Sequence, residues 1–224
     1  MKLLMPTVTD FISRQTPKEI ISPASDKEKA AIEILMGINK ITECLDQIYF
    51  SIEMLSGFRK KKNSKMNRHD YIVFMIEYFY LRITSIFDRS LRFSNLVFDI
   101  GLPERECRES TIIKNSKIKG TKVEESLKKL NKFTLNFKQI RNQVAHSDAF
   151  EDQELYPIRD YYYLIEDDNP GSLNNYKHIF KTRTDRYVHD KKNELTESAE
   201  QISDLIHDFF DSIVPYVETR INGK

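Results

Sequence analysis

The chain has few of the residues that cross-link or interrupt a fold. Its 224 residues include two cysteines, Cys44 and Cys107, in no metal-binding spacing, so neither a disulfide framework nor a zinc site is expected. Only 6 Gly and 7 Pro occur, and no linker rich in them divides the sequence. No stretch approaches the length of a membrane span, and the apolar part of the amino terminus is too short for a secretory signal. The sequence therefore predicts an ordered cytoplasmic protein.

The chain also lacks an excess of charge. It has 35 Lys and Arg against 34 Asp and Glu, a formal net charge of +1, so any nucleic-acid contact must come from local patches. It contains no glycine-rich phosphate loop, no HExxH pattern and no EF-hand loop. Kinase, NTPase, metalloprotease and calcium-binding functions therefore have no support. We expect neither a cofactor nor a metal.

Apolar residues recur at helical spacing over most of the chain. Residues 1–24 hold three prolines and little periodicity, which favours an extended arm. Ser25 and Glu28 have the spacing of a capping box, and a helix is expected over about 26–56, before Gly57. A second helix is expected over about 70–98, with Asn67 or His69 near its start. It is apolar nearly all round, which is typical of a helix buried between its neighbours.

Two further long helices complete the expected fold. One starts at the capping pattern of Thr121 and ends near His146, and the last runs over about 182–220. A short helix around 104–110 and a hairpin pairing 161–166 with 176–181 fall in the connections. Residues 25–222 are thus predicted to form a single all-α domain, a bundle of four long helices with short extra elements in the connections.

Two groups of charged residues stand out. Ionisable side chains on the apolar second helix need either a partner of opposite charge or a role at a functional site. Both interpretations remain open: the residues could support a site, or they could form an internal ion-pair network, such as Asp88 with Arg92. They include Glu77, Arg82, Asp88 and Arg89. The stretch 59–68 is basic without an acid, and it is typical either of a solvated loop or of a phosphate-binding segment. Its cations are Arg59, Lys60, Lys61, Lys62, Lys65 and Arg68.

The sequence RNQVAHSD, residues 141–148, falls where the third predicted helix gives way to a loop. It resembles the catalytic signature of the HEPN superfamily, an Arg followed after four to six residues by His, commonly with a polar residue directly after the Arg. Arg141, Asn142 and His146 match this signature position by position. The second helix, with Glu77, Arg82 and the pair Asp88 and Arg89, resembles the Cthe2314-like branch of that superfamily. The bare spacing arises about once by chance in such a chain, and Arg183 with His189 also satisfies it.

The resemblance implies a metal-independent endoribonuclease whose partner is RNA. In such cleavage the 2′-hydroxyl attacks the adjacent phosphate. His146 suits proton transfer near neutral pH, and Arg141 suits the charge that builds on the phosphate oxygens. Asn142 would orient the phosphate or His146. The family further implies a homodimer with a composite site, a role as toxin or antiviral defence effector, and an antitoxin or defence-system partner protein. The alternatives are a non-catalytic HEPN bundle that binds RNA or protein, and a module acting with an unseen nucleotidyl-transfer or antitoxin partner.

Overall fold

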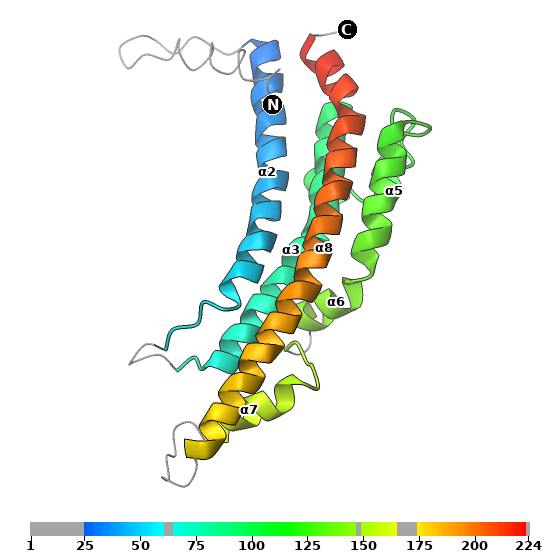
Figure 1. The fold of residues 1–224 in the computed structure, drawn as a ribbon. Helices are drawn as coiled ribbons and strands as arrows, with labels where there is room; N and C mark the ends of the chain where they lie inside the picture. The colour runs from blue at the N-terminus through cyan, green and yellow to red at the C-terminus, as the bar shows by residue number, and fades with distance from the viewer. Residues whose placement is uncertain (1–24, 61–64, 147–148, 165–173, 223–224) are drawn as a thin grey trace, which may run out of the picture. The chain divides into compact units, whose positions relative to one another are not determined.

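The computed structural model describes residues 25–60, 65–146, 149–164 and 174–222, and these residues form helices and no strand (Figure 1). The all-α prediction is confirmed, whereas the predicted arm, 1–24, lies outside the described residues. None of the described helices is long and apolar enough to cross a membrane. The helices are α2 (Asp26–Met54), α3 (Arg68–Val97), the 3₁₀ turn η1 (Glu104–Glu106), α4 (Glu109–Ile112), α5 (Lys122–Leu135), α6 (Lys138–His146), α7 (Leu155–Leu164) and α8 (Asn174–Asn222).

The predicted helix starts are made by side-chain caps. Ser25 Oγ accepts a hydrogen bond from the Glu28 amide at 3.3 Å, while the Glu28 carboxylate accepts one from the Ser25 amide at 2.8 Å. Asn67 Oδ1 accepts from the amide of Asp70 at 3.0 Å, and Thr121 Oγ1 accepts from the amide of Glu124 at 3.3 Å. Each bond satisfies an amide in the first turn, where the helix itself offers no partner.

Three sequence predictions about the second half of the chain are wrong. The predicted third helix is two helices, because the chain turns at 136–137, where the Phe137 ring reaches the Tyr80 ring at 5.9 Å. The last helix starts at Asn174 rather than 182, and Thr182 lies inside it. The predicted hairpin does not form, since 161–164 belong to α7 and 176–181 to α8, while 165–166 lie outside the described residues.

The described residues fall into two compact units. The first unit contains residues 25–44, 85–134 and 203–222, and the second contains 45–60, 65–84, 135–146, 149–164 and 174–202. The helices α2, α3 and α8 contribute residues to both units. Each unit has its own buried apolar side chains, for example Phe209 in the first and Phe79 in the second, both fully buried. α6 and α7 belong to the second unit.

Burial does not extend all round α3. Cys44 and Cys107 are buried free thiols, and Cys44 Sγ lies 3.2 Å from Ser85 Oγ. On α3, however, Phe74 is 50% exposed and Leu81 is 37% exposed. The prediction that α3 is buried on every side is therefore wrong, because within the described chain its partners leave one apolar face uncovered.

Candidate functional site

The predicted catalytic residues lie on α6, a nine-residue helix of the second unit. Arg141 is half-buried, and both Asn142 and His146 are exposed. Arg141 Nη1 donates a hydrogen bond to Asn142 Oδ1 at 3.0 Å. This bond uses one of the five guanidinium donors and leaves the Asn142 amide nitrogen as a donor. The group therefore presents N–H donors at the surface, as an anionic ligand requires.

Helix geometry separates Arg141 from His146. Five residues at about 100° each place the two side chains about 140° apart around α6. Asn142 and His146, four residues apart, share a face of the helix. Within one chain, α6 alone therefore does not direct the arginine and the histidine at the same point.

α6 is also poorly covered. None of its nine residues is buried, and its apolar side chains Ile140 and Val144 are only half-buried. Among the ion pairs of the described residues, none includes Arg141 or His146. A half-buried arginine and an exposed histidine that form no ion pair among the described residues suit contact with a ligand better than a role in stabilising the helix end.

The segment after α6 is held against α3 by Glu77. The Phe150 amide donates to Glu77 Oε1 at 2.8 Å, and Gln143 Nε2 of α6 donates to the Ala149 carbonyl at 3.4 Å. The Tyr80 ring contacts the Phe150 ring, with centroids 5.7 Å apart. Both flanks of α6 thus contact the same stretch of α3, Phe137 on one side and Phe150 on the other.

Asp152 ties the same segment to α8. Its Oδ2 accepts from the Tyr187 hydroxyl at 3.0 Å and lies 3.5 Å from Lys191 Nζ. Lys191 Nζ also lies 2.6 Å from Glu194 Oε2, and its side chain is only 11% exposed. A lysine so deeply buried requires nearby carboxylates, because an unpaired charge there would cost several kcal/mol. This network holds the segment around Asp152 against α8.

Burial raises the pKa of Tyr80 and, more strongly, that of Tyr187, and the neighbouring carboxylates of Asp152 and Glu194 raise both further. The folded state therefore favours the neutral phenols. Their contribution to stability is complete below the ordinary tyrosine pKa of about 10 and is lost as pH rises above it, at up to about 1.4 kcal/mol per pH unit for each group.

We therefore expect the melting temperature of the wild type to fall steeply between pH 9.5 and 11. In Tyr187→Phe, which cannot ionise at this position, the fall should be shallower. Calorimetry at 0.25-unit steps measures both slopes. Equal slopes in the two proteins would contradict this account of Tyr187. The exposed Tyr176→Phe serves as the matched control and should follow the wild type.

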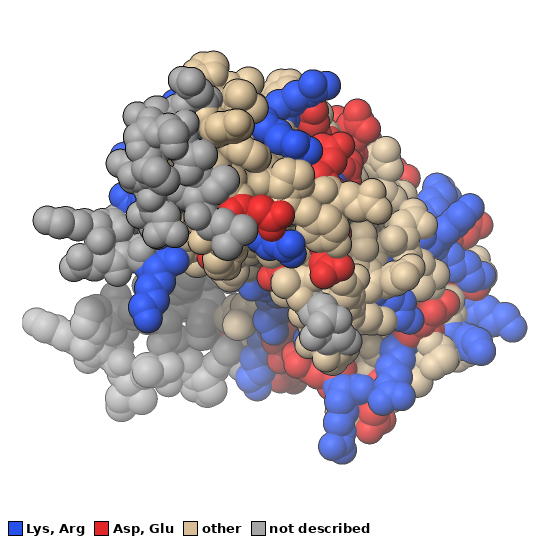
Figure 2. All heavy atoms as spheres, turned by 90° about the horizontal axis from the view of Figure 1, so that it is seen from below, with Lys and Arg blue, Asp and Glu red and all other residues tan. Residues whose placement is uncertain are grey.

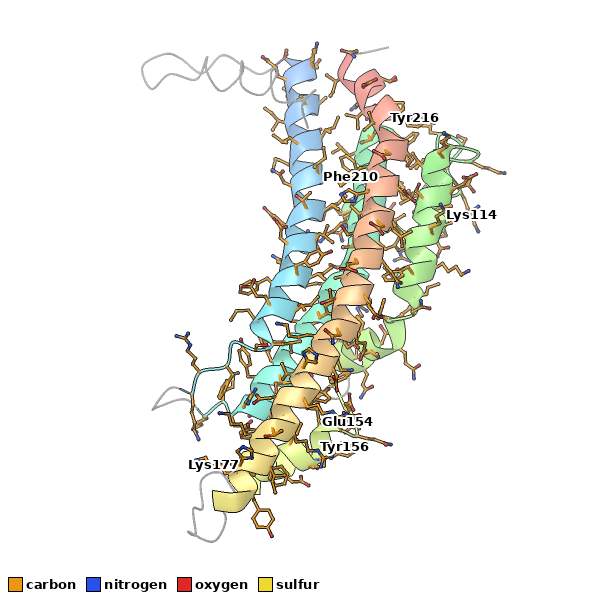
Figure 3. All side chains as sticks on the ribbon, viewed as in Figure 1. Lys114, Glu154, Tyr156, Lys177, Phe210 and Tyr216 are labelled. Atoms are coloured by element: carbon orange, nitrogen blue, oxygen red, sulfur yellow. The ribbon has the colours of Figure 1, made fainter. Side chains whose placement is uncertain are left out.

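A cavity of about 530 Å³ lies between α3, the segment 149–152 and α7, and sequence reasoning did not foresee it. Among the described residues that line it, Arg159 is the only Lys or Arg, and its guanidinium stacks over the Tyr156 ring at 5.0 Å. Figure 3 labels Tyr156 on α7, close to Glu154. Five carboxylates line the cavity, those of Asp70, Glu77, Glu151, Asp152 and Asp160. Neither Arg141 nor His146 lines it, and its acidic lining disfavours RNA phosphate there.

The remaining supporting residues separate into the two units. Arg82, in the second unit, places its guanidinium 4.7 Å over the Tyr78 ring. Asp88 and Arg89 lie in the first unit, where Arg89 Nη1 donates to the Lys40 carbonyl at 2.8 Å. The predicted pairing of Asp88 with Arg92 is wrong, since Arg92 Nη1 lies 3.7 Å from Glu104 Oε2 instead. Glu77 thus contacts the segment after α6 directly, through the Phe150 amide.

Within the described part of the basic stretch, Arg68 forms an ion pair with α8. Arg59, Lys60 and Lys65 are exposed, but Arg68 Nη2 lies 2.6 Å from Asp185 Oδ1 and ties the start of α3 to α8. Lys61 and Lys62 lie outside the described residues. On the face shown in Figure 2, basic and acidic side chains are interspersed among uncharged ones. An RNA-binding role of this stretch stays a prediction.

The second motif match, Arg183 and His189, lies within α8 rather than at a helix start. Both side chains are exposed, and His189 Nε2 lies 3.3 Å from Asn193 Nδ2. Six residues at about 100° each place Arg183 and His189 about 120° apart on the long helix. α8 continues beyond both residues to Asn222, whereas α6 ends at His146. This second match therefore lacks the position at a helix end that the match on α6 has.

Comparison with known proteins identifies the family but no individual relative. No curated protein and no solved structure matches the chain. The family model of the Cthe2314-like HEPN proteins matches residues 35–213, which include α3, α6 and the motif RNQVAH. Because this match covers most of the 224 residues, the chain belongs to the Cthe2314-like HEPN family.

Proposed function

We propose that the protein is a metal-independent endoribonuclease whose site is formed by Arg141, Asn142 and His146. The observation that carries the proposal is the solvent-accessible Arg–Asn…His group on α6, with Arg141 half-buried and Asn142 and His146 exposed, in a chain of the HEPN family. The group offers a proton carrier that works near neutral pH and a fixed cation with a planar fork of donors.

Cleavage needs both groups. The 2′-oxygen forms a bond to the adjacent phosphorus, the bond from phosphorus to the 5′-oxygen breaks, and the products end in a 2′,3′-cyclic phosphate and a 5′-hydroxyl. His146 takes the proton of the 2′-hydroxyl or returns one to the 5′-oxygen that leaves. Arg141 stabilises the extra negative charge on the phosphate oxygens. Asn142 shares a hydrogen bond with Arg141 and directs its free amide nitrogen to the same phosphate.

The proposed enzyme acts as a homodimer. On α6 of one chain Arg141 and His146 diverge by about 140°, so a single phosphate is reached more directly by the arginine of one chain and the histidine of another. In the cell such an enzyme would act as a toxin or defence effector against RNA, a role that rests on family resemblance.

A non-catalytic HEPN module that binds RNA or a partner protein is the second candidate. The same divergence of Arg141 and His146 favours it, because a group that never converges can bind phosphate without cleaving it.

The test incubates the purified protein in EDTA with total tRNA and with a single-stranded RNA, and identifies the product ends by mass spectrometry. Cleavage that leaves 2′,3′-cyclic phosphates supports the nuclease. A His146→Ala preparation made in parallel controls for contaminating ribonuclease. Binding without cleavage would reject the nuclease and favour the binding module.

A further inference from the structure

The cavity between α3, the segment 149–152 and α7 has aromatic walls. Its volume of about 530 Å³ is in the range of small-molecule sites, and all of its lining residues belong to the second unit. Four rings line it, those of Phe74, Phe150, Tyr156 and Tyr163. Phe74 is 50% exposed, Tyr156 is 37% exposed and Tyr163 is 59% exposed. Apolar surface that is gathered in one place and left uncovered is typical of a binding site.

The rings of this cavity already contact cations of the chain itself. Arg159 Cζ lies 5.0 Å from the centroid of the Tyr156 ring, and its guanidinium pairs with Asp160 at 3.2 Å. Lys191 Nζ, on α8, lies 5.8 Å from the centroid of the Phe150 ring. The negative face of an aromatic ring attracts a cation, and the attraction is stronger where water is excluded. The aromatic walls therefore have the chemistry that holds a cation.

Three of the five carboxylates that line the cavity accept hydrogen bonds from neutral donors. The donors are the Tyr163 hydroxyl for Asp70 at 2.7 Å, the Phe150 amide for Glu77 at 2.8 Å and the Tyr156 hydroxyl for Glu151 at 3.3 Å. Among the described residues, none of the three carboxylates forms an ion pair with a lysine or arginine. His69 Nδ1 lies 3.2 Å from Asp70 Oδ1 but carries charge only when it is protonated. The cavity thus has negative charge that a cationic ligand would balance.

The spacing of two of these carboxylates indicates the length of the ligand. Asp70 and Glu77 are seven residues apart on α3, which places them on one face of the helix and about 10 Å apart along its axis. Phe74 lies between them on the same face. Spermidine, a linear triamine, has about 10 Å between its terminal nitrogens, since an extended chain advances roughly 3.5 Å for every three bonds.

We infer that this cavity binds a linear polyamine in its protonated form. One terminal ammonium bonds to Asp70 and the other to Glu77, and each bond joins a cation to a carboxylate that lacks one. The methylene groups between them pack on the Phe74 ring. Neither Arg141 nor His146 lines the cavity, so this site is separate from that of the proposed nuclease.

Other ligands fit the cavity less well. Within the described part of the chain, no three His, Cys, Asp or Glu side chains are grouped so that they could hold a metal ion. An anion is repelled, because five carboxylates stand against Arg159. A single lysine side chain of a partner protein carries one ammonium group, so it satisfies Asp70 or Glu77 but not both. A free ligand with an ammonium group at each end satisfies both carboxylates.

The test is isothermal titration calorimetry of the full chain with spermidine, at about 0.15 M salt so that weak surface attraction is screened. Wild type, Asp70→Asn and Phe74→Ala are compared with Asp46→Asn and Phe50→Ala, matched controls at exposed positions on α2 in the same unit. We expect one spermidine to bind each chain. The Kd should rise about tenfold in Asp70→Asn, which loses a charge-assisted hydrogen bond, and at least about threefold in Phe74→Ala. Both controls should bind as the wild type does.

Titration with n-butylamine tests the recognition of two ends. Because it has one ammonium group, it should bind at least about tenfold more weakly than spermidine. Circular dichroism checks that each variant is folded, and Asn at position 70 keeps an oxygen that accepts the Tyr163 hydroxyl.

A wild type that does not bind spermidine would overturn the inference. So would Asp70→Asn and Phe74→Ala that bind as tightly as their controls, or n-butylamine that binds as tightly as spermidine. Displacement of spermidine by an equal concentration of magnesium chloride would reduce the binding to general charge attraction. A lysine-containing peptide that binds more tightly than spermidine would assign the cavity to a partner protein instead.

Discussion

His146→Ala and Arg141→Ala are each expected to lower the rate of RNA cleavage at least about a hundredfold, since general acid–base catalysis and phosphate charge stabilisation each contribute that much or more. Neither substitution should reduce the melting temperature by more than about 2 °C, because neither side chain is buried and surface substitutions change stability by less than about 0.5 kcal/mol. Initial rates at saturating and at low RNA concentration, with calorimetry on the same samples, measure both effects.

Matched controls are available for both residues. His207 on α8 and Arg105 on η1 are exposed side chains of the same types in the first unit. His207→Ala and Arg105→Ala should cleave as the wild type does. Arg141→Lys adds a finer comparison, because lysine keeps the charge but loses the planar fork, so cleavage should stay well below the wild-type rate. Cleavage by His146→Ala at the wild-type rate would remove His146 from the site.

Local chemistry explains which parts of the fold could be predicted. Ser25, Asn67 and Thr121 act through neighbours three residues away, so their caps are visible in the sequence and occur in the structure. At the division between α5 and α6, Phe137 contacts the ring of Tyr80, 57 residues earlier, and a contact between residues so far apart in the sequence has no local pattern. The presence of glycine at position 37 is likewise explained by the fold and not by the sequence, since a Cβ there would lie 2.6 Å from the Phe93 ring.

The residues of the candidate site likewise include some that the sequence could predict and others that it could not. The string RNQVAH indicated Arg141, Asn142 and His146 without a structure, and their exposure agrees with contact to a ligand. The role of Glu77 as acceptor for the Phe150 amide joins residues 73 positions apart, and a single sequence does not pair them. Asp152, Tyr187 and Lys191 were missed altogether, because a buried tyrosine and lysine around one carboxylate have no characteristic spacing.

The divergence of Arg141 and His146 on α6 predicts activity from two inactive proteins. Arg141→Ala and His146→Ala are each inactive alone, but co-refolded in equal amounts they should regain cleavage. In a mixed dimer, the arginine of one chain and the histidine of the other form one intact site. Random association makes about half of the dimers mixed, and each mixed dimer of two-fold symmetry has one intact site of its two. About a quarter of the wild-type rate is therefore expected.

The same experiment distinguishes where the two groups come from. If Arg141 and His146 of one chain served one phosphate, every site in the mixed dimer would lack one of them, and no activity would return. The double variant Arg141→Ala/His146→Ala, co-refolded with either single variant, should stay inactive, because no combination then supplies both groups.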